Sequence, residues 1–264
     1  MSGSIHTTSG AERSRTAWRD RVSNDRERAD ALLTRPQRHA VDEVTRRALV
    51  QGARAVVLTG STVRGSRTPC SDLDLMIVGH RPDLSGIEEE VDVYAVSSAQ
   101  LAQRVREDDD YIPWTLRFGC VLHDDGVLRA AALELEATRR WPSADRKLGQ
   151  ARRLLRTASL VVDSGDEEAA VEQCRAALTT TARWFLLGRK TLPLSRAELP
   201  GQLAELGERR LGDALEQTIH GGPSLEELRG VLHTAESLLP KANERPSPDA
   251  AARPKSRARR IAAR

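Results

Sequence analysis

Short apolar runs separated by turn residues mark the first half of the chain. Ala55–Leu58 is an apolar, β-branched run of strand length that ends at a glycine turn. Ser71–Val78 alternates acidic with apolar residues at its start, and Val91–Val96 is a further short run with strand character. Helical spacing precedes them from Arg13 to about Leu33, and again in a helix that Pro36 opens. The pattern predicts three strands that follow two helices.

The second half of the chain carries only helical patterns. Apolar residues recur at helical spacing over 128–140 and 144–162, with arginines opposite. Asp166 is placed to cap the next helix, which we expect to end near Gly188. These spacings predict long, amphipathic helices that bury one face each.

Two Ser-x-x-Glu sequences in this half have the form of a helix capping box. Ser224 with Glu227 predicts the start of the last helix. Ser195 with Glu198 has the same form, but we expect Pro200–Gly201 to delay that helix until after them.

Together these elements predict an α+β protein with two domains. A small mixed sheet flanked by helices is expected over 13–125, and an all-α bundle of four or five helices over 126–240. The ends, 1–12 and 241–264, are polar or basic and lack core residues, so we expect disordered tails there.

Composition removes several classes of function. The chain has 264 residues, a net charge of only +3, and few aromatic residues (four Trp, two Tyr, two Phe), which argues against a stacking platform for nucleic acid. Three widely spaced cysteines, Cys70, Cys120 and Cys174, fit a reducing cytoplasm better than a disulfide framework or a zinc site. No apolar run reaches the length of a membrane span, so we expect a cytoplasmic protein with no membrane partner.

Three acidic residues fall on the predicted strands. Asp72 and Asp74 are two apart and therefore share a face, where two carboxylates repel each other and resist burial. If the strand that carries Asp92 lies alongside, three carboxylates converge, which suits a magnesium ion with its preference for oxygen ligands. The triplet Asp108–Asp110 offers no such site, because consecutive side chains point in different directions, and we expect a helix cap or exposed turn there.

The loop before these acids has the composition of a phosphate cradle. Gly60 allows a ligand close to the backbone, and Ser61 is a good helix N-cap followed by free N–H groups. Arg64 and Arg67 lie in the same loop, where they could neutralise phosphate charge. A phosphate cradle facing a three-carboxylate metal site is the layout of nucleotidyl or phosphoryl transfer.

These residues carry a family resemblance. Gly60-Ser61, ten intervening residues and Asp72-Leu73-Asp74 resemble the signature of the polymerase-β-like nucleotidyltransferase superfamily, above all its aminoglycoside and minimal nucleotidyltransferases. The resemblance covers roughly Ala53 to Asp124, and its other matches are Arg64-Gly65, Ser71, Asp92 and the helix-to-strand element Arg117–Asp124.

The resemblance implies a division of roles among these residues. Asp72, Asp74 and Asp92 would bind two magnesium ions and act in catalysis. The triphosphate, with ATP as the expected nucleotide, would be held by Gly60, Ser61, Arg64 and Ser71. A general base could come from Glu134, Glu136 or Lys147, although a solvated helix face is the favoured explanation for each of them, or Asp92 could itself help deprotonate the acceptor.

The expected reaction is transfer of a nucleoside monophosphate to a hydroxyl of a small, aminoglycoside-like molecule, with release of pyrophosphate. Protein nucleotidylation, as in toxin–antitoxin pairs, and a non-catalytic nucleotide sensor stay open as alternatives. Nucleic acid is the less favoured acceptor, because the basic excess sits in the tail.

Overall fold

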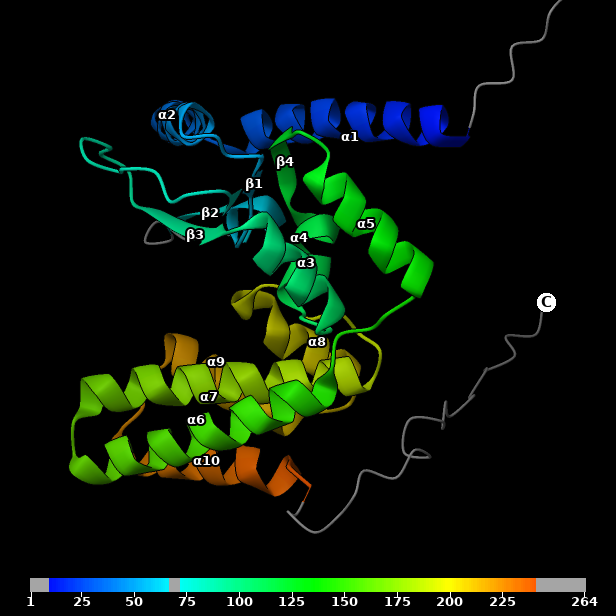
Figure 1. The fold of residues 1–264 in the computed structure, drawn as a ribbon. Coiled ribbons are helices and arrows are strands. Elements are labelled where there is room, and N and C mark those ends of the chain that lie inside the picture. The colour runs from blue at the N-terminus through cyan, green and yellow to red at the C-terminus, as the bar shows by residue number, and fades with distance from the viewer. Residues whose placement is uncertain (1–9, 67–71, 241–264) are drawn as a thin grey trace, which may run out of the picture. The chain divides into compact units, whose positions relative to one another are not determined.

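The computed structural model describes residues 10–66 and 72–240, and their side chains from residue 16 onward (Figure 1). These residues form two compact units. The first comprises the described chain up to Ser143 together with Leu192–Gln202, and the second comprises Ala144–Thr191 and the described chain from Leu203. The fold is α+β, as predicted. The domain boundary expected at residue 125 stays a prediction, and the compact units divide the chain later, after Ser143.

The first unit is built on a four-stranded mixed sheet in the order β3-β2-β1-β4. The central strand β1 (Ala55–Leu58) runs antiparallel to β2 (Leu73–Val78) and to β4 (Cys120–Asp124). The edge strand β3 (Val91–Val96) runs parallel to β2. All three predicted strands are present; β2 begins two residues later than expected, so that Asp72 directly precedes it.

Helices cover the sheet because its inward residues are almost entirely apolar. One face packs its alternating residues, such as Val57, Met76 and Val121, into a buried core with α3, α4 and α5 (Figure 1). The helix α2 begins after Thr34 with a proline in its first turn, as predicted, and packs against β2. The bounds of the five helices are α1 Gly10–Leu32, α2 Arg35–Val50, α3 Ser98–Arg106, α4 Tyr111–Phe118 and α5 Val127–Thr138.

The helix α1 satisfies backbone groups of the edge strand β4. Arg26 donates from Nε to the Leu122 carbonyl at 2.6 Å, and Asp25 accepts from the Val121 N–H at 3.1 Å. Charged side chains thus take the place of a neighbouring strand, which leaves β4 unable to pair with another chain.

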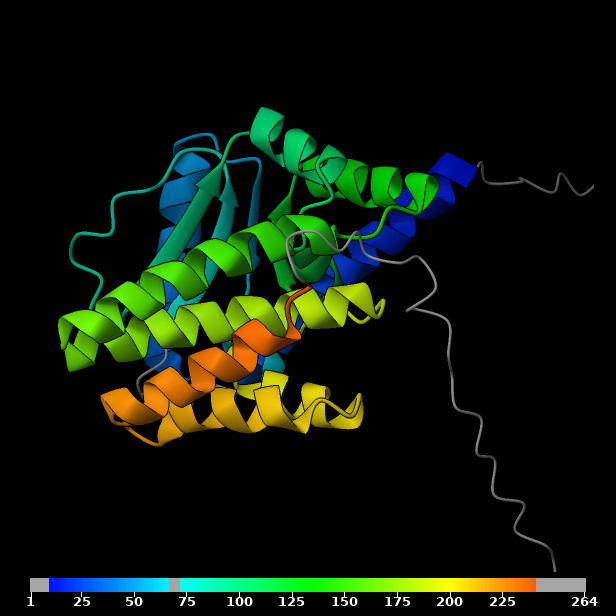
Figure 2. The ribbon, with the colours of Figure 1, turned by 90° about the horizontal axis from the view of Figure 1, so that it is seen from below.

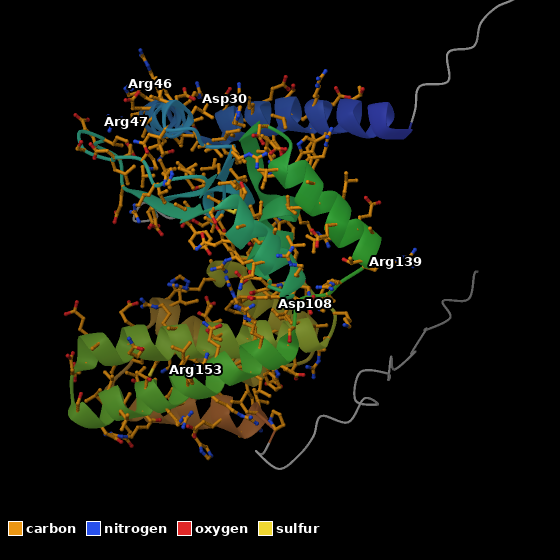
Figure 3. All side chains as sticks on the ribbon, viewed as in Figure 1. Asp30, Arg46, Arg47, Asp108, Arg139 and Arg153 are labelled. Atoms are coloured by element: carbon orange, nitrogen blue, oxygen red, sulfur yellow. The ribbon has the colours of Figure 1, made fainter. Side chains whose placement is uncertain are left out.

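The loop that leads into β3 is fixed to α2. The Arg47 guanidinium donates from Nη1 to the carbonyls of Asp83 and Ser85, both at 2.8 Å (Figure 3). These two bonds anchor the approach to β3 and therefore the start of the strand that carries Asp92.

The second unit is a helical bundle. Its helices α6 and α7 lie side by side along their length (Figures 1 and 2), and apolar residues at helical spacing form its core. As predicted, Asp166 caps α7, accepting from the Ala169 N–H at 3.0 Å, and Ser224 with Glu227 forms a capping box. The bounds are α6 Ala144–Ser164, α7 Glu167–Gly188, α9 Arg209–His220 and α10 Leu225–Leu238. Across the described part of the chain, no helix has both the length and the apolar character needed to cross a lipid bilayer.

Between α7 and α9 the chain returns to the first unit. Leu192–Gln202, which we call the strap, contains the short 3₁₀ turn η2 (Arg196–Glu198) and the first residues of α8 (Leu199–Glu205). The prediction that the helix starts after Pro200–Gly201 is wrong. The first turn of a helix tolerates proline, because its N–H groups have no partner within the helix.

The Gln202 side chain joins the two ends of the strap through hydrogen bonds. Gln202 accepts from the Leu194 N–H at 2.7 Å through Oε1 and donates from Nε2 to the Leu192 carbonyl at 3.2 Å. The strap therefore has a defined conformation of its own.

Candidate active site

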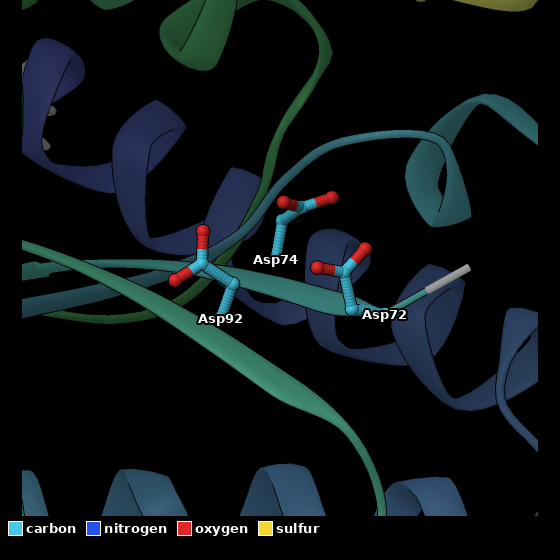
Figure 4. A group of neighbouring side chains, drawn as sticks. All are labelled: Asp72, Asp74 and Asp92. Atoms are coloured by element: carbon cyan, nitrogen blue, oxygen red, sulfur yellow. The ribbon is translucent and has the colours of Figure 1, made fainter. Parts of the chain in front are cut away.

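Three carboxylates converge at one end of β2 and β3. Asp74 in β2 is the register partner of Asp92 in the parallel strand β3, and Asp72 lies two residues before Asp74 on the same face. One carboxylate oxygen from each residue lies within 4.8 Å of the others, and the three side chains project from the same side of the strands (Figure 4). The structure thus brings together the three acidic residues that sequence analysis singled out. We call them the aspartate triad.

The triad is electrostatically unfavourable without a cation. No hydrogen-bond donor from the described residues reaches any of its carboxylates. Burial, and then the negative charges of Asp72 and Asp92, raise the pKa of Asp74 to about 6, although the positive charge of Arg196 opposes the shift. Clustered oxygen ligands that lack donors are what a hard divalent cation such as magnesium requires, so these residues fit the metal that the resemblance implied.

Gly60 lies directly beside the Asp74 side chain of the triad. It has a positive φ of +72°, and a Cβ atom placed there would lie 1.8 Å from Oδ2 of Asp74. The neighbouring Thr59 N–H donates to the Asp74 carbonyl at 2.8 Å. Glycine is therefore needed at this position both for its backbone conformation and for the space that the Asp74 carboxylate takes.

The loop after Gly60 is tighter than the sequence indicated. Ser61 precedes a single 3₁₀ turn, η1 (Thr62–Arg64), and its side chain makes no capping hydrogen bond. The N–H groups of Arg64 and Ser66 both donate to the Ser61 carbonyl at 3.1 Å. Ser61 stands at the N-cap position, as predicted, but it precedes a single 3₁₀ turn and makes no side-chain cap, because the loop turns back too soon for an α-helix to start.

Two predicted phosphate ligands cannot be placed. Ser71 and Arg67 lie outside the described residues. The roles of Gly60 and Ser61 in holding a triphosphate stay predictions.

Arg64 is engaged by a residue that lies far away in the sequence. Its Nε and Nη2 donate to the Glu198 carboxylate at 3.2 and 2.7 Å, and its guanidinium lies 4.8 Å from the centre of the Phe118 ring. The Glu198 carboxylate and neighbouring Ser195 hydrogen bonds keep the arginine side chain in one place. Whether Arg64 also binds phosphate, as the resemblance implied, stays a prediction.

Sequence analysis missed the contribution of the strap. Glu198 and Ser195 were identified only as a capping box, yet Glu198 pairs with Arg64 and the Ser195 hydroxyl lies 2.9 Å from that of Ser66. Arg196, between them, acts electrostatically on Asp74. Nothing in the local pattern of residues 192–202 reports these partners, because they lie more than a hundred residues earlier.

Tyr111 is a further residue that was missed. Burial raises its pKa to about 12, and the negative charge of Asp74 acts in the same direction, so the phenol is neutral at physiological pH. Its ring packs edge-on against that of Tyr94, with centroids 5.0 Å apart. The two rings therefore pack against each other, and Tyr111 is near enough to Asp74 for the charge of that carboxylate to act on its phenol.

Comparisons with known proteins agree with this geometry. Residues 41–118 match the family model of the nucleotidyltransferase domain, a stretch that runs from α2 to the end of α4 and includes the whole triad. A crystal structure of a nucleotidyltransferase-like protein from Exiguobacterium sibiricum is similar at a TM-score of 0.38 and 17% identity, over 74% of this chain and 71% of that one. At that score the structural similarity adds nothing to the family match. No curated protein matches the chain significantly.

The family model and the mixed sheet that carries the triad point to the same conclusion. The resemblance drawn from the sequence is confirmed: residues 41–118 match the nucleotidyltransferase domain, which supports the resemblance to the polymerase-β-like superfamily.

Proposed function

We propose that this protein is a magnesium-dependent enzyme that transfers a nucleoside monophosphate from ATP to a hydroxyl of a small, aminoglycoside-like molecule. The observation that supports it most is the aspartate triad itself. Three carboxylates without donors from the described residues converge beside Gly60, within a domain whose family performs this transfer.

The triad residues have distinct positions in the proposed reaction. The Asp74 carboxylate occupies the space that a side chain at residue 60 would take, and Asp72 and Asp92 would complete the set of oxygen ligands for the metal. Magnesium bound there would orient the α-phosphate and stabilise negative charge on the attacking and leaving oxygens.

The transfer exchanges one phosphorus–oxygen bond for another. The acceptor hydroxyl oxygen forms a bond to the α-phosphorus, the bond from that phosphorus to the oxygen bridging to the β-phosphate breaks, and pyrophosphate leaves. The hydroxyl proton must go to a base. Asp92, the exposed member of the triad, is our candidate, because solvent and acceptor can both reach it.

The charge near the triad supports a cationic acceptor. Glu88 and Glu90 are exposed just before β3, so further negative charge precedes the exposed carboxylate of Asp92 along the chain. A molecule that carries several amino groups would be attracted to such a surface.

The test follows a label from the α-phosphate. The purified protein is incubated with magnesium and with ATP, GTP, CTP or UTP that carries the label on the α-phosphate. A panel of aminoglycosides is added first, and host lysate is added in a separate reaction. We expect label on a small molecule from the wild-type protein, and none from Asp74→Asn.

Two results would overturn this proposal. Label on a protein band would indicate protein nucleotidylation. Triphosphate binding with no movement of label would indicate a sensor without catalysis.

A further inference from the structure

The strap touches the loop after Gly60 at two points. Glu198 pairs with Arg64 through both guanidinium nitrogens that face it, at 2.7 and 3.2 Å. The Ser195 and Ser66 hydroxyls lie 2.9 Å apart. All four residues belong to the first compact unit, so these contacts lie within one body.

The Glu198 carboxylate is itself held in place. Its Oε2 accepts from the Ser195 N–H at 3.2 Å and from the Ser195 hydroxyl at 2.6 Å, in addition to Arg64. A carboxylate fixed by its own helix start has little freedom to swing away. It is therefore a rigid partner for Arg64, and it does not move in and out of the nucleotide site.

The pairing leaves part of the guanidinium available. Glu198 takes Nε and Nη2 of Arg64, and the Phe118 ring lies against the guanidinium 4.8 Å away. Among the described residues, Nη1 of Arg64 has no hydrogen-bond partner. An arginine has five N–H donors, so one edge can be fixed by a carboxylate while another binds phosphate.

We propose that Glu198 is a positioning residue for nucleotide binding, which orients Arg64 so that its remaining N–H groups meet the triphosphate. This inference rests on the proposed function, because it assumes that Arg64 binds phosphate. It assigns to the strap, a segment distant in sequence from the matched domain, a part in nucleotide affinity. The gain is pre-organisation: an arginine already fixed loses less side-chain freedom when the nucleotide binds.

The decisive variant is Glu198→Gln. Glutamine retains an oxygen that can accept from Ser195, but it removes the negative charge that orients Arg64. We expect KM for the triphosphate, and the Kd measured by calorimetry with Mg²⁺ and ATP, to rise about tenfold, with kcat changed by less than about threefold.

The last helix supplies a matched control. Glu227 occupies the same position of a capping box, but its Oε1 accepts from Gln217 and no arginine pairs with it in the described structure. Glu227→Gln therefore removes a capping charge without touching Arg64, and we expect unchanged KM and Kd.

A double-mutant cycle separates an effect through Arg64 from any other. In an Arg64→Lys background the bidentate pair is already lost, so Glu198→Gln should raise Kd by less than about twofold more. Equal effects in both backgrounds would overturn the inference. So would an unchanged Kd, or a lower Kd, which would mean that Glu198 competes with the nucleotide.

The binding measurement also keeps this inference distinct from the proposed function. If the wild-type protein transfers no label, catalysis fails as a proposal, yet the ratio of Kd values still decides whether Glu198 positions Arg64.

Discussion

Two groups of three aspartates lie in the first unit, and they differ in what surrounds them. In Asp108–Asp110, the buried Asp109 accepts from Arg104 Nη1 at 2.8 Å and from the Tyr111 N–H at 2.8 Å. In the triad, no carboxylate receives a hydrogen bond from the described residues. The same type of side chain is a structural ion-pair partner in one group and a carboxylate without a donor from the described residues in the other.

The difference shows how to separate structural from functional acids. A buried carboxylate that is matched by protein donors stabilises the fold, and its removal leaves those donors unsatisfied. Carboxylates that repel one another and lack donors cost stability, which a protein tolerates where a ligand supplies the missing positive charge.

The largest expected difference concerns nucleotidyl transfer. Asp74→Asn should lower the rate of label transfer by at least about 10²-fold, because in the proposed reaction this carboxylate binds the metal through its negative charge. Asp109→Asn, the matched change in the other group, should leave the rate within about threefold. Equal losses in the two variants would show that the triad has no special role.

A second large effect is expected at Gly60. Gly60→Ala places a Cβ atom 1.8 Å from Oδ2 of Asp74, so it should displace that carboxylate and lower the transfer rate about tenfold or more. Gly52→Ala is the control, since Gly52 has a φ of +80° but no atom within 4 Å of the added Cβ. Both variants should lose about 1 kcal/mol of stability from backbone strain, measured by urea unfolding. Full activity in Gly60→Ala would contradict the geometry of the triad.

For stability we expect the opposite order: Asp109→Asn should destabilise the fold, and Asp74→Asn should not. Asp109→Asn breaks the pair with Arg104, while an amide oxygen can still accept from the Tyr111 N–H. We expect the free energy of unfolding to fall by about 2 kcal/mol in urea titrations. A loss no larger than that of Asp42→Asn, a change at an exposed aspartate of α2, would show that the Arg104 pair contributes little.

The smallest effect is a pH-dependent gain of stability in Asp74→Asn. Because the pKa of Asp74 rises from 3.8 to about 6 on folding, the folded chain binds more protons between those values, and stability falls as pH rises through about 6. With EDTA at pH 7.5, Asp74→Asn should therefore be more stable than wild type by about 1 kcal/mol, allowing for solvent screening of the partly exposed group.

Two conditions check the origin of this gain. The difference should shrink as the pH is lowered to 4, where the wild-type carboxyl is largely protonated in the folded state and no longer carries the repelling charge. Addition of Mg²⁺ at pH 7.5 should stabilise wild type and leave Asp74→Asn almost unchanged. A constant difference at every pH would rule out the titration of Asp74 as its cause.

Local patterns predicted most of the fold. The strands at Ala55, Leu73 and Val91, and the helices capped by Asp166 and Ser224, follow from apolar periodicity and side-chain capping, which act over a few residues. The convergence of the triad was also accessible, because strand pairing places the acids of neighbouring strands side by side.

What the sequence could not supply were tertiary partners. Ser195 with Glu198 and Ser224 with Glu227 have the same sequence pattern and each forms a capping box, yet within the described residues only the first pairs with an arginine of another loop. Pro200 lies in the first turn of α8, where proline is tolerated. The local sequence does not show that the helix begins at Leu199, before the proline.

The strap also limits where the chain can be cut into separate fragments. The chain passes between its compact units three times, after Ser143, before Leu192 and after Gln202. A gene fragment cut at Ser143 would encode the whole triad but not Glu198, the carboxylate that holds Arg64. Recombination at a single breakpoint after Ser143 would therefore separate Arg64 from the carboxylate that pairs with it.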